Sequence, residues 1–79
     1  MRKVYVDAIV RFTKDGDILP IAFIWEDGRK YMVDRVLDKR RAASLKVGGQ
    51  GIRYKCRVYG REVYLYFEGG NRWFIESAH

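Results

Sequence analysis

The stretch "RYKCRVYGREVYLYFEGGNRWFIES" (residues 53–77) indicates the fold class most directly, because polar and apolar residues alternate along three runs separated by glycines. Alternation with a period of two is typical of β-strands that bury one face. A two-residue turn at Gly60-Arg61 predicts inward apolar pairs throughout the first hairpin: Val58 with Val63, Cys56 with Leu65, and Tyr54 with Phe67.

The outward face of the same hairpin is polar and aromatic. The predicted register pairs Arg57 with Tyr64, Lys55 with Tyr66 and Arg53 with Glu68. After it, a three-residue loop at 69–71 would pair Glu68 with Arg72 and send Trp73 and Ile75 to the core. A two-residue loop would send Phe74 inward instead, and the opposite charges of the Glu68–Arg72 pair favour the first choice.

Three further strands are predicted upstream. Residues 3–13 alternate, with an inward set of Val4, Val6, Ala8, Val10 and Phe12. Residues 18–26 are apolar on both faces, and Pro20 is tolerated there at a strand start, an edge or a bulge. Asp27-Gly28 predicts a tight hairpin turn into a return strand at 29–38. That turn gives these pairs: Glu26 with Arg29, Ile24 with Tyr31, and Ala22 with Val33.

The segment 39–51, "KRRAASLKVGGQG", has no strand alternation. Two alternatives remain open for it: a mobile basic loop, or a short helix capped by Asp38 and ending at Gly48. The chain is therefore predicted to be all-β, a single domain over 1–79. Its six antiparallel strands form a meander curled into a small SH3-like or OB-like barrel, which hides the sheet edges.

Composition narrows the class of protein. The chain has 79 residues, of which 48% are hydrophobic, and it shows neither a signal peptide nor an apolar run of membrane-spanning length. We therefore expect a soluble cytoplasmic protein with no membrane contact. The single cysteine, Cys56, is expected in the core, and the single histidine, His79, is the last residue. We expect no catalysis, because no nucleophile has a base to activate it. We also expect no metal or cofactor, because Asp7, Asp34 and Asp38 are isolated acids on alternating strands and no dinucleotide fingerprint is present.

The net charge of +6 is concentrated in one part of the chain. Residues 39–61 contain eight basic side chains and no acidic one, whereas residues 1–38 are balanced and residues 62–79 are acidic. A basic cluster of this kind favours a polyanionic partner such as nucleic acid. The alternative interpretation is an ordinary solvated strand face, stabilised by cross-strand pairs of cations and tyrosines.

The candidate site is the outward face of 53–66. Arg53, Lys55 and Arg57 would stand in a row about 14 Å long, suited to successive phosphates, and Tyr64 and Tyr66 would stack on bases. The neighbouring basic residues would fold over the bound strand as a flap: Lys39, Arg40, Arg41 and Lys46.

The preferred hypothesis is a non-catalytic accessory domain that binds single-stranded DNA or RNA without sequence preference. The alternative is a protein-interaction module with no nucleic-acid role, using an exposed strand edge or an aromatic rim. Under either hypothesis we expect the protein to be a monomer or a weak dimer.

Two blocks of sequence, "PIAFIWEDGRKYMVDRVLD" (20–38) and "YKCRVYGREVYLYFEGGNRWFIE" (54–76), resemble a family of small bacterial domains of unknown function. Members share a strand ending in tryptophan, a glycine turn, Tyr-x-Val-x-x-Val-Leu, and later Tyr-x-Leu-Tyr and Arg-Trp-Phe. The resemblance implies a compact β domain that occurs alone or appended to proteins similar to Y-family polymerases, with a replication or repair protein as a possible partner. This chain departs from the family at 38–51, where relatives have an aromatic loop.

Overall fold

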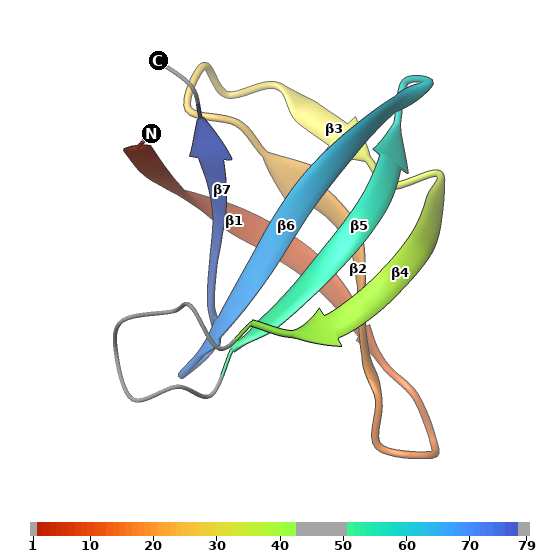
Figure 1. The fold of residues 1–79 in the computed structure, drawn as a ribbon. Helices are drawn as coiled ribbons and strands as arrows, with labels where there is room; N and C mark the ends of the chain where they lie inside the picture. The colour runs from red at the N-terminus through yellow and green to blue at the C-terminus, as the bar shows by residue number, and fades with distance from the viewer. Residues whose placement is uncertain (1, 43–50, 78–79) are drawn as a thin grey trace.

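The computed structural model describes residues 2–42 and 51–77, which form one antiparallel sheet (Figure 1). Its spatial order is β3-β2-β1-β7-β6-β5-β4. The strands are β1 (Arg2–Phe12), β2 (Ile18–Ile24), β3 (Lys30–Met32), β4 (Arg35–Arg41), β5 (Ile52–Val58), β6 (Arg61–Gly69) and β7 (Arg72–Ser77). The prediction of an all-β antiparallel fold is confirmed. Among the described residues no helix is long and apolar enough to cross a membrane.

The sheet curls into a half-barrel because one short link joins its two edges. Val33 donates its backbone N–H to Ile21 of β2, and the next residue, Asp34, donates to Arg57 of β5. Side chains from β2 therefore meet those of β5, β6 and β7 in one core: Phe23, Tyr54, Cys56, Val58, Leu65, Trp73 and Ile75. The fully buried Tyr54 spans this core, and its hydroxyl donates to the Ile18 carbonyl at 2.5 Å.

The link also corrects the strand count. The predicted return strand at 29–38 divides at Val33-Asp34 into β3 and β4, on opposite edges of the sheet, so the described residues form seven strands and not six. Asp38 lies inside β4 and caps no helix, and the basic residues 39–41 extend that strand. The described residues contain no helix, and the rest of the predicted loop or helix, including Lys46, lies outside them, as does His79.

The β5–β6 hairpin turns one residue earlier than predicted. Its central residues are Tyr59 and Gly60, with φ of 50° and 73°, as a type I′ turn requires. The register is therefore shifted by two residues, so that Arg57 faces Glu62, Lys55 faces Tyr64 and Arg53 faces Tyr66. A shift of two leaves every side chain on its predicted face, because strand side chains alternate with that period.

The other two hairpins also differ from their predicted loops. Around Gly28 (φ 86°) a three-residue loop joins Trp25 to Arg29, so Phe23 faces Tyr31 and the register moves by one. Gly70 and Asn71 form a two-residue turn, and Glu68 lies at a bulge beside it. The inward placement of Trp73 and Ile75 is nevertheless confirmed.

The predicted inward residues of strand β1 are confirmed except at its C-terminal end. Val4 is buried, and Val6, Ala8 and Val10 pack against the core, but Phe12 is 69% exposed. The register of β1 with β2 shifts beyond Ile9, where Val10 faces Pro20. Pro20 thus stands at a bulge, one of the positions where a residue without an N–H group is tolerated.

Candidate nucleic-acid interface

Five cations project from the outer surface of β4 and β5. Residues directly opposite in an antiparallel pair point to the same side, and β4 places Arg35 opposite Arg57 and Arg40 opposite Arg53. Lys55 lies between these two pairs, opposite Asp38. We define the basic face as this surface together with Tyr64 of the adjoining strand β6: Arg35, Arg40, Arg53, Lys55, Arg57 and Tyr64.

Two carboxylates neutralise part of the basic face. Arg40 forms an ion pair with Asp38 at 2.7 Å, and the Lys55 ammonium lies 3.3 Å from the Glu62 carboxylate. Within the described ranges no carboxylate lies within ion-pair distance of Arg35 or Arg57. The two arginines thus form a like-charge pair beside the hairpin tip, with Glu62 of β6 as the other cross-strand neighbour of Arg57.

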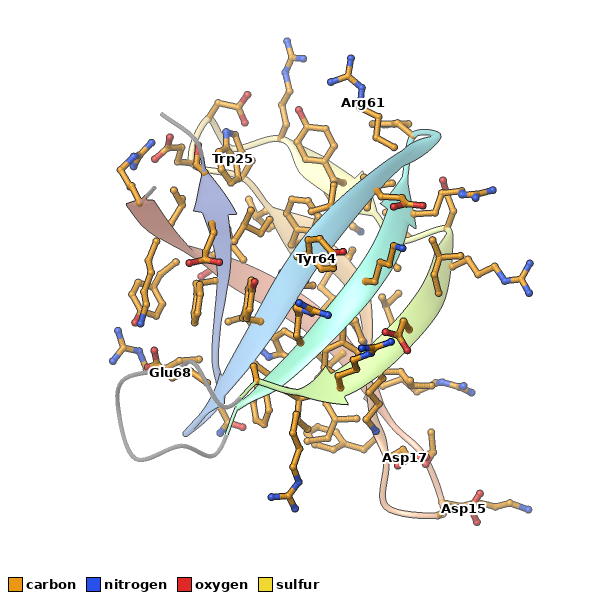
Figure 2. The ribbon with its side chains drawn as sticks, viewed as in Figure 1. Asp15, Asp17, Trp25, Arg61, Tyr64 and Glu68 are labelled. Carbon is orange, nitrogen blue, oxygen red and sulfur yellow. The ribbon has the colours of Figure 1, made fainter. Side chains whose placement is uncertain are left out.

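Tyr64 provides an aromatic surface beside these cations. Its side chain is 40% exposed on β6, and the Arg53 guanidinium lies 4.7 Å from the centre of its ring (Figure 2). An arginine stacked on a tyrosine widens the flat surface available to a base, because both groups are planar. The cation–π pair predicted for Arg57 with Tyr64 is replaced by this diagonal contact from Arg53.

Several residues of the predicted site lie elsewhere. Tyr66 is only 8% exposed, because its ring stacks on Phe74 with centres 4.8 Å apart, so its predicted role as a stacking surface for bases is corrected. Lys39 points to the other side of β4, where its ammonium lies 3.4 Å from Asp17 and 5.8 Å from the Tyr54 ring. Arg41, two residues further on, shares that side.

A second group of cations and aromatic rings lies on the outer surface of β1 and β7. We call it the Glu68 cluster: Lys3, Tyr5, Glu68, Arg72 and Phe74. Tyr5 donates its hydroxyl to Glu68 at 2.7 Å, and Lys3 and Arg72 both approach that carboxylate at 3.6 Å. The Arg72 guanidinium also covers the Tyr5 ring at 4.2 Å, and Lys3 covers Phe74 at 4.7 Å. The predicted pair of Glu68 with Arg72 is therefore confirmed, whereas the predicted pair of Glu68 with Arg53 is wrong.

The pKa values of two groups, Glu68 and Cys56, depend on their surroundings in the fold. The hydrogen bond from Tyr5, with smaller contributions from Arg72 and Lys3, holds the pKa of Glu68 below its ordinary value. Burial raises the pKa of Cys56 to about 11, so this thiol is protonated at neutral pH and is a poor nucleophile. In the described part of the chain no three metal-ligating side chains converge.

The predicted site residues lacked one member of the basic face, Arg35, and one acidic neighbour of that face, Glu62. Arg35 joins the basic face only because β4 pairs with β5 across an intervening segment, and no short-range pattern indicates that pairing. Glu62 neutralises Lys55 because the true turn brings it next to Arg57, which the predicted register did not.

Comparison of this chain with protein-family models, with curated proteins and with solved structures gives no match. The resemblance to small bacterial domains and to segments appended to repair proteins therefore stays an expectation from the sequence.

Proposed function

We propose that this protein is a non-catalytic domain that binds single-stranded nucleic acid, DNA or RNA, through the basic face and without strong sequence preference. Arg35, Arg53 and Arg57 contact phosphates, and Tyr64 stacks on a base. The observation that supports this most strongly is the arrangement of Arg35 directly opposite Arg57, with neither guanidinium in an ion pair among the described residues.

Like charges directly opposite in a sheet destabilise it, by up to about 1 kcal/mol per pair. A phosphate bound between the two guanidiniums removes that repulsion and forms charge-assisted hydrogen bonds to both. The arginine pair is thus better suited to the bound state than to the free protein.

The spacing of the other groups also suits a single strand. Arg53 and Arg57 stand on one face of β5, four residues and about 14 Å apart, with Lys55 between them. Stacking of a base on an aromatic ring contributes about 1–3 kcal/mol and tolerates any base, which agrees with binding that is not sequence-specific.

The test is the salt dependence of oligonucleotide binding, measured by fluorescence anisotropy with a labelled mixed-sequence single strand. Each phosphate neutralised on a single strand contributes about 0.7 to the slope of log K against log salt. Replacing Arg35, Arg53 and Arg57 together with serine should therefore reduce that slope by about 2 and weaken binding at low salt.

A matched control removes the same charge elsewhere. Arg11, Lys14 and Lys30 are exposed cations, and no carboxylate of the described residues pairs with them. Their triple serine variant should keep a wild-type slope. Equal slopes in the two triple variants would refute the assigned face. Absence of binding at 50 mM salt, with salt-insensitive capture of a specific protein, would favour the protein-interaction alternative.

A further inference from the structure

Strands β6 and β7 separate next to the basic face. Their pairing ends at Leu65 opposite Ile75. Beyond that point β7 continues alongside β1 as far as Ser77, while the first residues of β6 run with β5 toward the hairpin tip. Figure 2 shows Trp25 in the angle between the two strands, and Tyr64 on the adjoining part of β6.

The split has a cavity on each side, and the two share part of their lining. The inner cavity, of about 640 Å³, is lined mainly by apolar and aromatic residues: Phe23, Trp25, Tyr31, Val58, Tyr59, Arg61, Val63 and Ile75. The outer cavity, of about 490 Å³, includes side chains of the basic face. Trp25, Val63 and Ile75 line both, so the two cavities adjoin at these side chains.

The residues that line the split between β6 and β7 suit an uncharged, flat group. Half-buried Trp25 offers an aromatic surface behind it, and the inner cavity is of the size and apolar character usual for small-ligand sites, which span roughly 300–1,000 Å³. Glu62 and Glu76 line the outer cavity and repel a phosphate, whereas their oxygens can accept hydrogen bonds from the amino group of a base. Arg53 and Tyr64 line the same outer cavity, so the sugar-phosphate chain can stay on the basic face.

We infer that the split between β6 and β7 binds one unstacked base of the same single strand, inserted against Trp25 while its phosphates remain on the basic face. This inference rests on the proposed function and adds to it a pocket that holds a base in place. Bases bearing an exocyclic amino group fit the two carboxylates better than thymine or uracil.

Tryptophan fluorescence tests the inference, because a base stacked on an indole quenches its emission. Binding of a short mixed-sequence oligonucleotide is followed by anisotropy and, in parallel, by protein emission. Trp73 is buried in the core and provides a constant background. The expected result is quenching that saturates with the anisotropy signal and is absent in Trp25→Phe. Quenching should also be lost with a probe of the same length in which every nucleotide is abasic.

The variant Trp25→Leu keeps an apolar side chain without a stacking surface and should lower affinity about tenfold. The control Phe12→Leu removes an exposed aromatic ring far along β1 and should leave affinity unchanged. Anisotropy binding without Trp25 quenching would overturn the base pocket and leave the proposed function standing. Absence of anisotropy binding would overturn both. Quenching by a hydrophobic peptide but not by the oligonucleotide would assign the split to a protein partner and overturn the inference.

Discussion

The basic face and the Glu68 cluster contain the same kinds of side chain, but they differ in whether the cations form ion pairs with the protein's own carboxylates. In the Glu68 cluster, Lys3 and Arg72 each have a carboxylate and an aromatic ring within reach. On the basic face, Arg35 and Arg57 oppose each other, and among the described residues neither has a carboxylate within ion-pair distance. Cations beside aromatic rings are therefore not by themselves a sign of a binding site. The informative difference is whether the protein's own acids already pair with the cations.

The same contrast applies to the aromatic residues. Phe74 is fully buried on the outer surface, between Tyr66 and Tyr5, whereas Tyr64 is 40% exposed. The first group contributes stability by removing apolar area from water. The second leaves a ring available to a partner.

The largest expected effect is on stability at Phe74. Phe74→Ala should lower the free energy of unfolding by about 3–5 kcal/mol, since it removes a fully buried ring and leaves a cavity. Tyr64→Ala should cost less than about 1 kcal/mol, because the ring is partly exposed, but should weaken oligonucleotide binding about tenfold. Urea denaturation and anisotropy measure the two quantities. Comparable losses of stability at the two positions would contradict the distinction between Phe74 as a core residue and Tyr64 as a binding residue.

The next largest effect is expected for a charge reversal at Arg35, which should increase stability and weaken oligonucleotide binding. Arg35→Glu replaces the like-charge pair with an ion pair to Arg57 and should raise the free energy of unfolding by about 0.5 kcal/mol. It should weaken oligonucleotide binding about tenfold, because a phosphate then meets a carboxylate. Arg35→Gln should fall between wild type and Arg35→Glu in both measurements. A variant that loses stability and keeps its affinity would contradict the proposed role of the arginine pair.

The smallest effect concerns the pH dependence of the Glu68 cluster. Because the pKa of Glu68 is lowered by folding, its charged form stabilises the native state above its ordinary value of 4.5, and this contribution is lost as the pH falls through the lower folded value. Glu68→Gln should therefore reduce Tm at pH 7, and the difference from wild type should shrink by pH 3. A difference in Tm that is independent of pH would mean that the charge of Glu68 does not matter.

The sequence predicted which face each residue of the β5–β6 hairpin occupies but not its register. Alternation is satisfied equally by any shift of two residues, so only the turn distinguishes the possibilities. Tyr59 adopts a positive φ that a bulky side chain rarely accepts, which explains why a turn at Gly60-Arg61 was the natural prediction.

Features that depend on distant parts of the chain were not predictable from local patterns. The burial of Tyr66 and Phe74 requires β7 to lie between β1 and β6, and the basic face requires β4 to pair with β5. The division of the return strand at Val33-Asp34 follows from curling the sheet, because the two residues bond to opposite edges. The candidate site was therefore predicted where it lies within one hairpin, at Arg53, Lys55, Arg57 and Tyr64, and was missed at Arg35.

An NMR titration of the ¹⁵N-labelled protein with a mixed-sequence single-stranded oligonucleotide at low salt most directly distinguishes the two surfaces. We predict that the amide shifts cluster in 35–41 and 53–66, with the indole N–H of Trp25 among the moving signals. Residues of the Glu68 cluster should stay in place. Shifts confined to the Glu68 cluster, or no shifts at all, would contradict the proposal that Arg35, Arg53 and Arg57 mark the binding surface.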